Sequence, residues 1–283
     1  MQIQIDHSRD RLAARQSPPP GADPAASGMR ALMWLNAERV AYVGLLGAPS
    51  VRTLGACSIY LSLNVPHRIS IDGGPWQSTG LSVVPPQVPH RIGSGERMIC
   101  NLLVETETVA PGALPEWLRD GRGAVESPAL LAELQGALRA FRNGEQRYAR
   151  TADFDRAFFG APLGASALDR RIAAVLERIR LDPDQPHAAK ECAAAIHVSV
   201  SRFLHLFKAE VGVPFRSYRT WQRARSVLYY VTRTANLASI ALDMGYPDST
   251  HFSHSVRQVY GLTPKSIFAG CRRLELHGRE AAT

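Results

Sequence analysis

The chain has 283 residues, of which 45% are hydrophobic and 20% charged, and its formal net charge is +8. This composition is typical of a soluble globular protein, and the length allows two domains that each bury a core. No apolar run approaches the roughly 20 residues that span a bilayer, and no secretory signal opens the chain, so we expect a cytoplasmic protein without membrane contact.

Positive charge is concentrated in the second half of the chain. Residues 1–164 hold 16 Lys and Arg against 15 Asp and Glu, whereas residues 165–283 hold 17 against 10. Phosphate contacts supply most of the non-specific affinity of proteins for nucleic acid. The charge alone is weak evidence, but it becomes useful where it coincides with a DNA-binding motif.

The cysteines show no CxxC spacing, which is typical of reduced thiols rather than of a metal or redox centre. They are Cys57, Cys100, Cys192 and Cys271. We therefore predict no metal and no cofactor.

The first half of the chain predicts a tail followed by a small β domain. Residues 1–28 are rich in Pro, Ala and Gly and predict a disordered tail. From Met33 to Thr108, short β-type runs alternate with turn residues, which is typical of an antiparallel barrel or sandwich. The expected strands are Arg39–Leu45, Ala56–Leu63, Arg68–Ile71, Gly80–Val84, His90–Ile92 and Met98–Glu105.

The pentapeptide Val-Pro-His-Arg-Ile occurs twice and contains His67 and His90. The second copy follows a Pro-rich corner that resembles the turn of cupin-type barrels, in which such a His can bind metal. A metal site needs a third or fourth ligand nearby, and no HxH pair is present. We favour polar residues at a barrel mouth or strand end, and we consider both as candidates for a ligand pocket.

After Val109 the pattern becomes helical. A short helix is expected at Pro115–Gly121 and a longer one at Pro128–Arg142, which carries a leucine stripe. The stripe either joins the core of its own subunit or packs against a second subunit, and the sequence favours neither. Residues 144–165 are expected to form an interdomain connection.

From Ala188 to Lys265 the chain twice encodes a short helix, a turn, and a second helix that ends in an apolar residue and Gly, with Pro soon after. This is the layout of a helix-turn-helix, whose second helix can enter the major groove of DNA. A preceding helix capped by Ser166 and a linking helix at Pro214–Val231 complete the expected domain.

The second helix of each unit is expected to read DNA. Ser199 or Ser201 caps the first reading helix, and Asp248 or Ser249 caps the second. Their buried faces are expected to hold Phe203, Leu206, Phe207 and Val211 in the first helix, and Phe252, Val256 and Val259 in the second.

The opposite faces carry the candidate DNA contacts. The candidates for base contact are Ser201, Arg202, Leu204, His205, Ser249, Thr250, Ser253 and His254. The candidates for phosphate contact are Lys208, Arg219, Arg223, Arg257 and Lys265. Arg225 adds to the basic character of the linking helix. The alternative is that all of these are merely solvated residues on amphipathic helices.

Two signatures occur in order. The first is Ser199-x-Ser201-Arg202-Phe203-Leu204-x-Leu206-Phe207-Lys208-x-Glu210-x-Gly212. The second is Ile240-Ala241-x-x-Met244-Gly245-Tyr246-x-Asp248, followed by Phe252-Ser253 and Tyr260-Gly261-x-Thr263-Pro264. From Leu168 to Phe268 the chain thus resembles the AraC/XylS family of bacterial transcription regulators. The resemblance implies seven helices, binding to promoter DNA and, as in many members, activation through contact with RNA polymerase.

Three positions depart from the family pattern. His197 stands where the family prefers Gly, Ser255 stands where a larger residue is usual, and His254 stands where Arg is frequent. These departures affect the expected base preference rather than the fold. The first half resembles the family's cupin-like sensing and dimerisation domain only loosely.

We therefore predict an α+β chain with a cupin-like domain at residues 29–160 and a double helix-turn-helix domain at residues 161–283. The expected partners are promoter DNA, RNA polymerase, a small-molecule effector and a second subunit. One alternative is a constitutive DNA-binding protein whose barrel dimerises without a ligand. A less favoured one is an enzyme, either a metal cupin that uses His67 and His90 or a zinc-bearing repair adaptor, for which the cysteines lack the required clustering.

Overall fold

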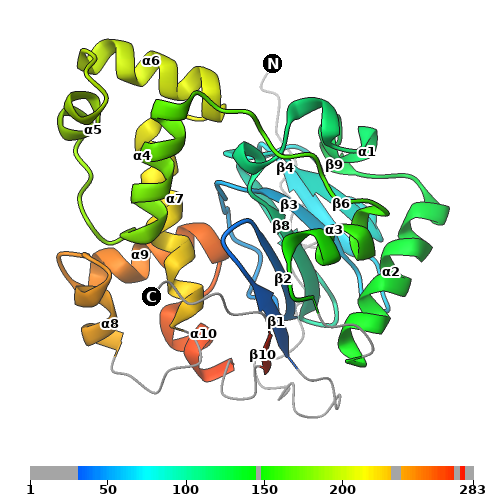
Figure 1. Ribbon diagram of the computed structural model, residues 1–283. Coiled ribbons are helices and arrows are strands. Elements are labelled where there is room, and N and C mark those ends of the chain that lie inside the picture. The colour runs from blue at the N-terminus through cyan, green and yellow to red at the C-terminus, as the bar shows by residue number, and fades with distance from the viewer. Residues whose placement is uncertain (1–30, 145–147, 231–236, 271–274, 278–283) are drawn as a thin grey trace, which may run out of the picture.

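The structure is a computed structural model that describes residues 31–144, 148–230, 237–270 and 275–277. Figure 1 shows a sheet domain beside a layer of carboxy-terminal helices, so the predicted α+β class is confirmed. The tail predicted at residues 1–28 lies outside the described residues. No described helix is long and apolar enough to cross a membrane.

Two sheets form the first domain. The larger has the order β10-β1-β2-β8-β3-β6-β9 and the smaller the order β5-β4-β7. The bounds in the larger sheet are β1 Leu32–Leu35, β2 Arg39–Leu45, β3 Cys57–Leu61, β6 Leu81–Val84, β8 Met98–Val104, β9 Gly123–Ala124 and β10 Glu275–His277. Those in the smaller sheet are β4 His67–Ile71, β5 Gln77–Thr79 and β7 His90–Gly93. The two sheets form an open sandwich rather than a closed barrel, and they pack through Tyr60, Ile69, Ile92 and Ile99.

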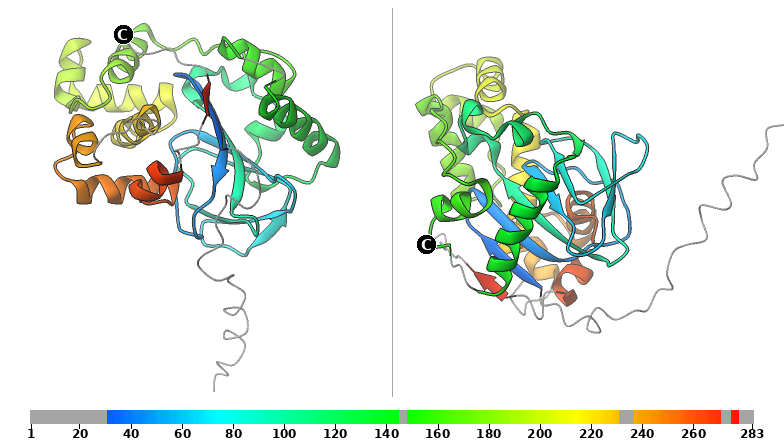
Figure 2. Two further views of the ribbon diagram at one scale, coloured as in Figure 1. Left: turned by 90° about the horizontal axis from the view of Figure 1, so that it is seen from below. Right: turned by 90° about the vertical axis from the view of Figure 1, so that its right-hand side faces the viewer.

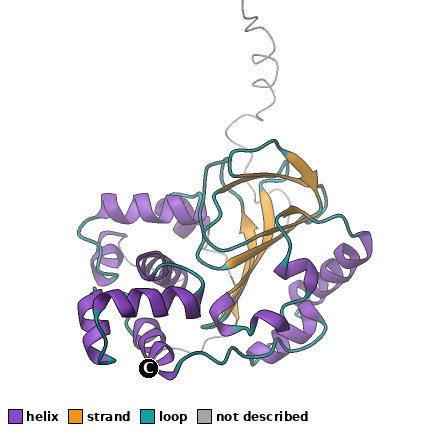
Figure 3. Cartoon of the chain, turned by 90° about the horizontal axis from the view of Figure 1, so that it is seen from above, coloured by secondary structure: helices purple, strands orange, loops and turns teal. Residues whose placement is uncertain are grey.

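The larger sheet is buried on both faces because successive side chains of a strand point to opposite sides. Ala41 and Val43 of β2 pack against helices of the first domain. Val40, in register with Leu103 of β8, faces the carboxy-terminal helices. Figure 3 shows the strands lying between these two groups of helices.

Short helices cover the outer face of the larger sheet. They are η3 Pro111–Ala113, α1 Glu116–Arg119, α2 Pro128–Arg142 and α3 Thr151–Phe159. The 3-10 turn η2 Thr106–Thr108 lies instead at the boundary with the carboxy-terminal helices, where Glu107 pairs with Arg180 of α4. Leu134 and Leu138 of α2 are buried against the sheet, so the leucine stripe belongs to the core of its own chain. Figure 2 shows α2 and α3 on the side of the sheet away from the carboxy-terminal helices.

The prediction that residues 144–165 form only a connection was wrong, because they contain α3. The Phe154 ring of α3 stacks on Trp34 at 4.7 Å between ring centroids. A buried ion pair between Arg39 and Asp155, with 2.9 Å from Nε to Oδ1, also holds α3 on the sheet. These long-range contacts stabilise a segment whose sequence carries only a weak helical pattern.

The carboxy-terminal domain has seven α-helices in its described part, the number that the family resemblance implies. They are α4 Arg170–Leu181, α5 Ala189–Ala195, α6 Val200–Val211, α7 Phe215–Ser226, α8 Leu237–Asp243, α9 Ser249–Tyr260 and α10 Pro264–Gly270, with a 3-10 turn η4 Val227–Tyr229 after α7. The predicted cap at Ser166 was wrong. Asp169 caps α4 instead, because its carboxylate accepts the backbone N–H of Arg171 at 2.8 Å.

The two domains share a hydrophobic core. Met33 and Leu103 of the sheet pack with Trp221 of α7 and Val256 of α9. The chain also returns to the sheet after α10, where β10 pairs in parallel with the edge strand β1. This strand was not predicted from the sequence. It covers an edge that would otherwise leave backbone groups unpaired.

Candidate DNA interface and interdomain cavity

Caps at both ends hold the first reading helix, α6. The Ser199 hydroxyl accepts a hydrogen bond from the backbone N–H of Arg202 at 3.2 Å. Gly212 ends the helix in the left-handed conformation, with φ of 82°. Such caps satisfy backbone groups that a helix end leaves free. Phe203 and Phe207 are fully buried, so the packing fixes which face of α6 points outward.

The outward face of α6 holds all five residues that the sequence predicts there. Ser201, Arg202, Leu204, His205 and Lys208 are exposed. Leu204 is apolar and yet 40% exposed. An exposed apolar side chain beside donors suits a surface that meets base edges, where thymine presents a methyl group.

The second reading helix, α9, begins at an Asp cap. The Asp248 carboxylate accepts the backbone N–H groups of Thr250 and His251 at 2.7 and 2.8 Å. These bonds, with that to the His251 ring, hold the pKa of Asp248 below its ordinary value, and the His251 backbone contributes most. Phe252 and Val256 are fully buried, and Gly261 ends the helix with φ of 69°.

The predicted contacts of α9 also lie on its outer side. Ser249, Thr250, His254 and Arg257 are exposed, and Ser253 is half-buried. Lys265, in the first turn of α10, is exposed as well. The two reading helices therefore each have one buried and one accessible face.

Three of the four arginines of the linking helix α7 are engaged within the protein, whereas Arg216 is exposed. Arg219 and Arg223 are half-buried. Arg219 donates from Nη1 to the carbonyl oxygen of His187 at 2.9 Å, and the guanidinium of Arg223 lies over the Tyr246 ring, 5.6 Å from its centroid. Arg225, expected to add to the basic character of this helix, is instead buried.

The two candidate pocket histidines are buried in the sandwich with both ring nitrogens bonded. His67 contacts the hydroxyls of Ser62 and Ser82, each at 2.8 Å. His90 contacts Tyr60 at 2.8 Å and the carbonyl oxygen of Val88 at 3.0 Å. Burial lowers the pKa of both histidines to about 4, so they are neutral at pH 7. Their role in ligand contact stays a prediction.

No metal site accompanies these histidines in the described ranges. There, no group of three or more His, Cys, Asp or Glu side chains lies close enough to hold a metal ion. Cys57, Cys100 and Cys192 are free buried thiols, and Cys271 lies outside the described residues.

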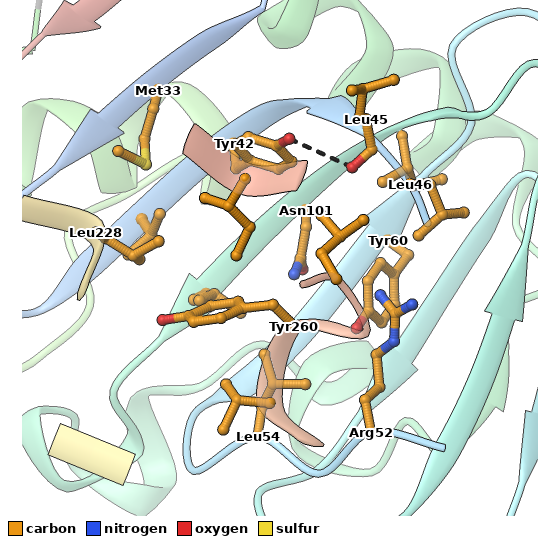
Figure 4. Close-up of a pocket in the computed structure, with 16 residues that line it drawn as sticks. Met33, Tyr42, Leu45, Leu46, Arg52, Leu54, Tyr60, Asn101, Leu228 and Tyr260 are labelled. Atoms are coloured by element: carbon orange, nitrogen blue, oxygen red, sulfur yellow. Dashed lines mark hydrogen bonds between the residues drawn. The ribbon is translucent and has the colours of Figure 1, made fainter. Parts of the chain in front are cut away.

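A cavity lies between the larger sheet and the second helix-turn-helix unit (Figure 4). Its volume is about 70 Å³. Most of its lining is apolar or aromatic, and five lining residues come from the carboxy-terminal domain: Leu228, Val259, Tyr260, Leu262 and Ile267. A ligand there would contact both domains at once.

Arg52 is the one charged side chain among the described residues that line the cavity. It is almost fully buried, and its Nε and one terminal nitrogen have no hydrogen-bond partner. Burial lowers its pKa, whereas the neighbouring Tyr60 opposes this shift. Figure 4 shows Arg52 beside Tyr60 on one side of the cavity, with Met33 and Leu228 on the other. A buried cation without an anion is costly.

Arg52 was not predicted from the sequence, since no local pattern distinguishes it from other single arginines. Its place depends on a loop pairing, in which the backbone of Arg52 exchanges hydrogen bonds with that of His90 at 2.9 and 3.0 Å. The guanidinium also reaches the end of α9, because a Cβ added to Gly261 would lie 2.3 Å from a terminal nitrogen of Arg52.

Comparison with known proteins gives matches to the carboxy-terminal helices. A helix-turn-helix domain family matches residues 192–269. The arabinose operon regulatory proteins of Salmonella typhimurium and Escherichia coli are each 30% identical over 80 residues, which is 28% of this chain and 28% and 27% of theirs. The expected resemblance to the AraC/XylS family is thus confirmed for the carboxy-terminal helices. The invasion protein InvF of Salmonella typhi is also 30% identical, over 71 residues, 25% of this chain and 33% of InvF. The chain thus matches about a third or less of the length of these relatives.

The whole fold has solved counterparts. ToxT from Vibrio cholerae superimposes with a TM-score of 0.55 at 10% identity, covering 84% of this chain and 99% of ToxT. A ligand-free ToxT variant with a single substitution gives a TM-score of 0.54 at 13% identity, covering 83% of this chain and 98% of that one. At these identities the likeness shows the two-domain fold alone.

Proposed function

We propose that this chain is a sequence-specific DNA-binding regulator that activates transcription. The observation that carries the proposal is the matched construction of α6 and α9, each with an aromatic residue buried on one face and polar residues exposed on the other. Two reading helices on one domain fit successive stretches of major groove. Contact with RNA polymerase and dimerisation belong to this proposal, and so does a cytoplasmic location, because bacterial promoter DNA lies there.

We assign a different kind of DNA recognition to each of the two reading helices. Arg202 of α6 can donate two hydrogen bonds to guanine, and Leu204 can meet a thymine methyl. The exposed side chains of α9 are shorter, so its recognition relies more on phosphates and DNA shape. Lys208, Arg257 and Lys265 are the exposed candidates for phosphate contact.

The proposal is tested by selecting duplexes from a random library with the whole chain and measuring affinity by fluorescence anisotropy. We expect salt-dependent, sequence-specific binding that Arg202→Ala weakens by roughly 1–3 kcal/mol. Arg119→Ala, an exposed arginine of the sheet domain, is the matched control and leaves affinity unchanged. Equal binding of selected and random duplexes would refute sequence-specific recognition.

A small-molecule effector in the interdomain cavity is part of the same proposal. A neighbouring ToxT structure, with a TM-score of 0.52 at 10% identity, was solved bound to (E)-4-(8-methylnaphthalen-1-yl)but-3-enoic acid, an apolar carboxylic acid. The lining here favours the same chemistry, because one guanidinium with two unpartnered nitrogens lies among mostly apolar walls, and no acidic side chain of the described residues lines the cavity. Such a site suits an amphipathic molecule with one negative charge. Sugars would find too few polar groups.

The effector would act by stabilising one domain arrangement over another. Its cavity is lined by Val259 and Tyr260, which lie in the last turn of α9. A ligand at this place can therefore bias the position of the second reading helix. The AraC/XylS family that the carboxy-terminal helices resemble consists of transcription regulators, so no reaction is proposed for the cavity.

A further inference from the structure

The loop between α4 and α5 lies against the second helix-turn-helix unit. Gly245, in the turn between α8 and α9, has φ of 66°. A Cβ added there would lie 2.2 Å from the carbonyl oxygen of Asp184 in that loop. Only glycine permits this approach, because any side chain would require the backbone to move. The segment that leads into the first unit thus touches the turn of the second.

Arg219 joins the same loop to the linking helix. Its Nη1 donates to the carbonyl oxygens of Pro186 and His187, the latter at 2.9 Å. The guanidinium also lies over the Phe215 ring, 5.0 Å from the centroid. Phe215 packs in the core of the first unit with Phe203 of α6, at 4.8 Å between ring centroids. Arg219 therefore connects the loop, α7 and the first reading helix.

Arg223, one turn further along α7, makes the corresponding contact with the second unit. Its guanidinium covers the ring of Tyr246, the residue after Gly245. The Tyr246 hydroxyl bonds to that of Ser255 on α9 at 2.9 Å, and its ring meets Phe252 edge-on at 5.3 Å. Arg219 is thus connected to α6 through Phe215, and Arg223 is connected to α9 through Tyr246.

We propose that Arg219, Arg223 and Gly245 form a brace that fixes the separation and orientation of α6 and α9. They are positioning residues that act on DNA through the two reading helices and do not contact phosphates. This inference rests on the proposed DNA-binding function. Linked modules gain affinity only when their geometry allows both to engage, so the brace matters for a duplex that both helices contact.

Two glycine variants test the brace without changing charge. Gly245→Ala inserts a methyl group against Asp184, whereas Gly212→Ala adds similar backbone strain, at φ of 82°, with nothing within 4 Å of the new atom. On the selected duplex, Gly245→Ala is expected to lower affinity about tenfold or more. On a shortened duplex that holds only the α6 half, its affinity stays at the wild-type value. Gly212→Ala leaves the ratio of the two affinities unchanged. An equal change of that ratio in both variants would overturn the proposal.

An arginine variant separates positioning from phosphate contact. Each phosphate contact contributes about 0.9 to the slope of log affinity against log salt. Arg219→Met keeps the apolar part of the side chain. It is expected to weaken binding to the full duplex while leaving the slope of log affinity against log salt at its wild-type value. Lys208→Met, on the exposed face of α6, lowers the slope by about 0.9. A comparable fall in slope for Arg219→Met would show that Arg219 binds phosphate and would remove it from the brace.

A distance measurement in the absence of DNA tests the brace separately from the proposed DNA binding. Spin labels at Lys208→Cys and Arg257→Cys, in a Cys271→Ser background, report the separation of α6 and α9. We expect one narrow distance distribution that Gly245→Ala and Arg219→Met broaden or shift. Circular dichroism confirms that each variant is folded. An unchanged distribution in both variants would refute the brace even if DNA binding is found.

Discussion

Glu105 at the end of β8 and Arg225 of α7 form an ion pair across the boundary between the two domains. The distance from Arg225 Nε to Glu105 Oε1 is 2.7 Å. The Glu105 side chain is only 1% exposed and that of Arg225 only 4%. The indole N–H of Trp221 donates to the same carboxylate at 2.9 and 3.0 Å. The boundary is therefore held by a buried charge pair as well as by apolar packing.

Removing one partner of this pair is expected to destabilise the chain strongly. At pH 8, where the Glu105 carboxyl is ionised, Arg225→Met leaves it buried without its cation, which costs about 3–5 kcal/mol in the free energy of unfolding. Urea denaturation followed by circular dichroism measures the change. Arg119→Met removes an exposed partner of Asp120 and is the matched control, for which we expect little or no change.

The double variant Glu105→Gln with Arg225→Met is expected to recover part of the loss, because no unpaired charge then remains buried. If the double variant is as unstable as the sum of the two single variants, the ion pair is not the source of the effect.

The Glu105 carboxyl is also expected to make the stability of the folded chain depend on pH. Burial and the neighbouring Glu107 raise the pKa of Glu105 to about 7 from an ordinary value of 4.5, while Arg225, Trp221 and Arg180 oppose the shift. A raised pKa in the folded state gives a contribution to stability that is present below pH 4.5 and is lost as the pH rises through about 7. The predicted loss over this window is about 3 kcal/mol. Glu105→Gln removes it, which unfolding curves at successive pH values would show.

The buried histidines act in the opposite direction over an overlapping window. The pKa values of His67 and His90 fall from 6.5 to about 4, so their contribution is full above pH 6.5 and is lost as the pH falls through about 4. The contribution of Glu105 is therefore measured as the difference in the free energy of unfolding between the wild type and Glu105→Gln at each pH. If this difference does not vary between pH 4.5 and 7, the raised pKa of Glu105 is wrong.

Local patterns in the sequence predicted the elements of the DNA-binding domain well. Ser199, Asp248, Gly212 and Gly261 lie at the helix ends, where short-range hydrogen bonding requires these residue types. The buried faces of α6 and α9 followed from apolar spacing in the same way. Each feature depends on residues within about one helical turn, so the sequence alone contains enough information.

The features that could not be predicted depend on contacts between distant segments. Arg225 looks like a surface arginine of an amphipathic helix until Glu105, 120 positions earlier, is placed beside it. The cavity at Arg52 requires both sheets and the second helix-turn-helix unit to be assembled. β10 pairs with a strand from the other end of the chain. No periodicity encodes such relationships.

A glycine controls how closely the two domains approach. A Cβ added to Gly55 would lie 2.1 Å from Cγ of the Trp221 indole. Gly55→Ala is therefore expected to separate the domains locally and to destabilise the chain by about 1–3 kcal/mol, as overpacking does. Tryptophan fluorescence and urea denaturation measure the change. Gly112→Ala, with nothing within 4 Å of the new atom, is the control. Equal effects of the two substitutions would mean that Gly55 does not set this contact.

One substitution of Arg52 is expected to have two opposite effects on stability, one in the ligand-free chain and one in the presence of a ligand. In the ligand-free chain, Arg52→Gln removes a buried charge that lacks an anion, so the melting temperature is expected to rise. In the presence of decanoate, the wild-type chain gains stability through binding, whereas Arg52→Gln gains little. Differential scanning fluorimetry with and without decanoate measures both changes.

Neutral and short ligands distinguish the role of the guanidinium from that of the apolar walls. Decanol offers the same chain without the charge, and acetate offers the charge without the chain. Because the cavity combines apolar walls with one cation, decanoate should stabilise the wild-type chain more than either. Equal stabilisation of wild type and Arg52→Gln by decanoate would refute the assignment of Arg52 as the carboxylate partner. If none of the three shifts the melting temperature while specific DNA binding persists, the result favours the alternative of a constitutive DNA-binding protein.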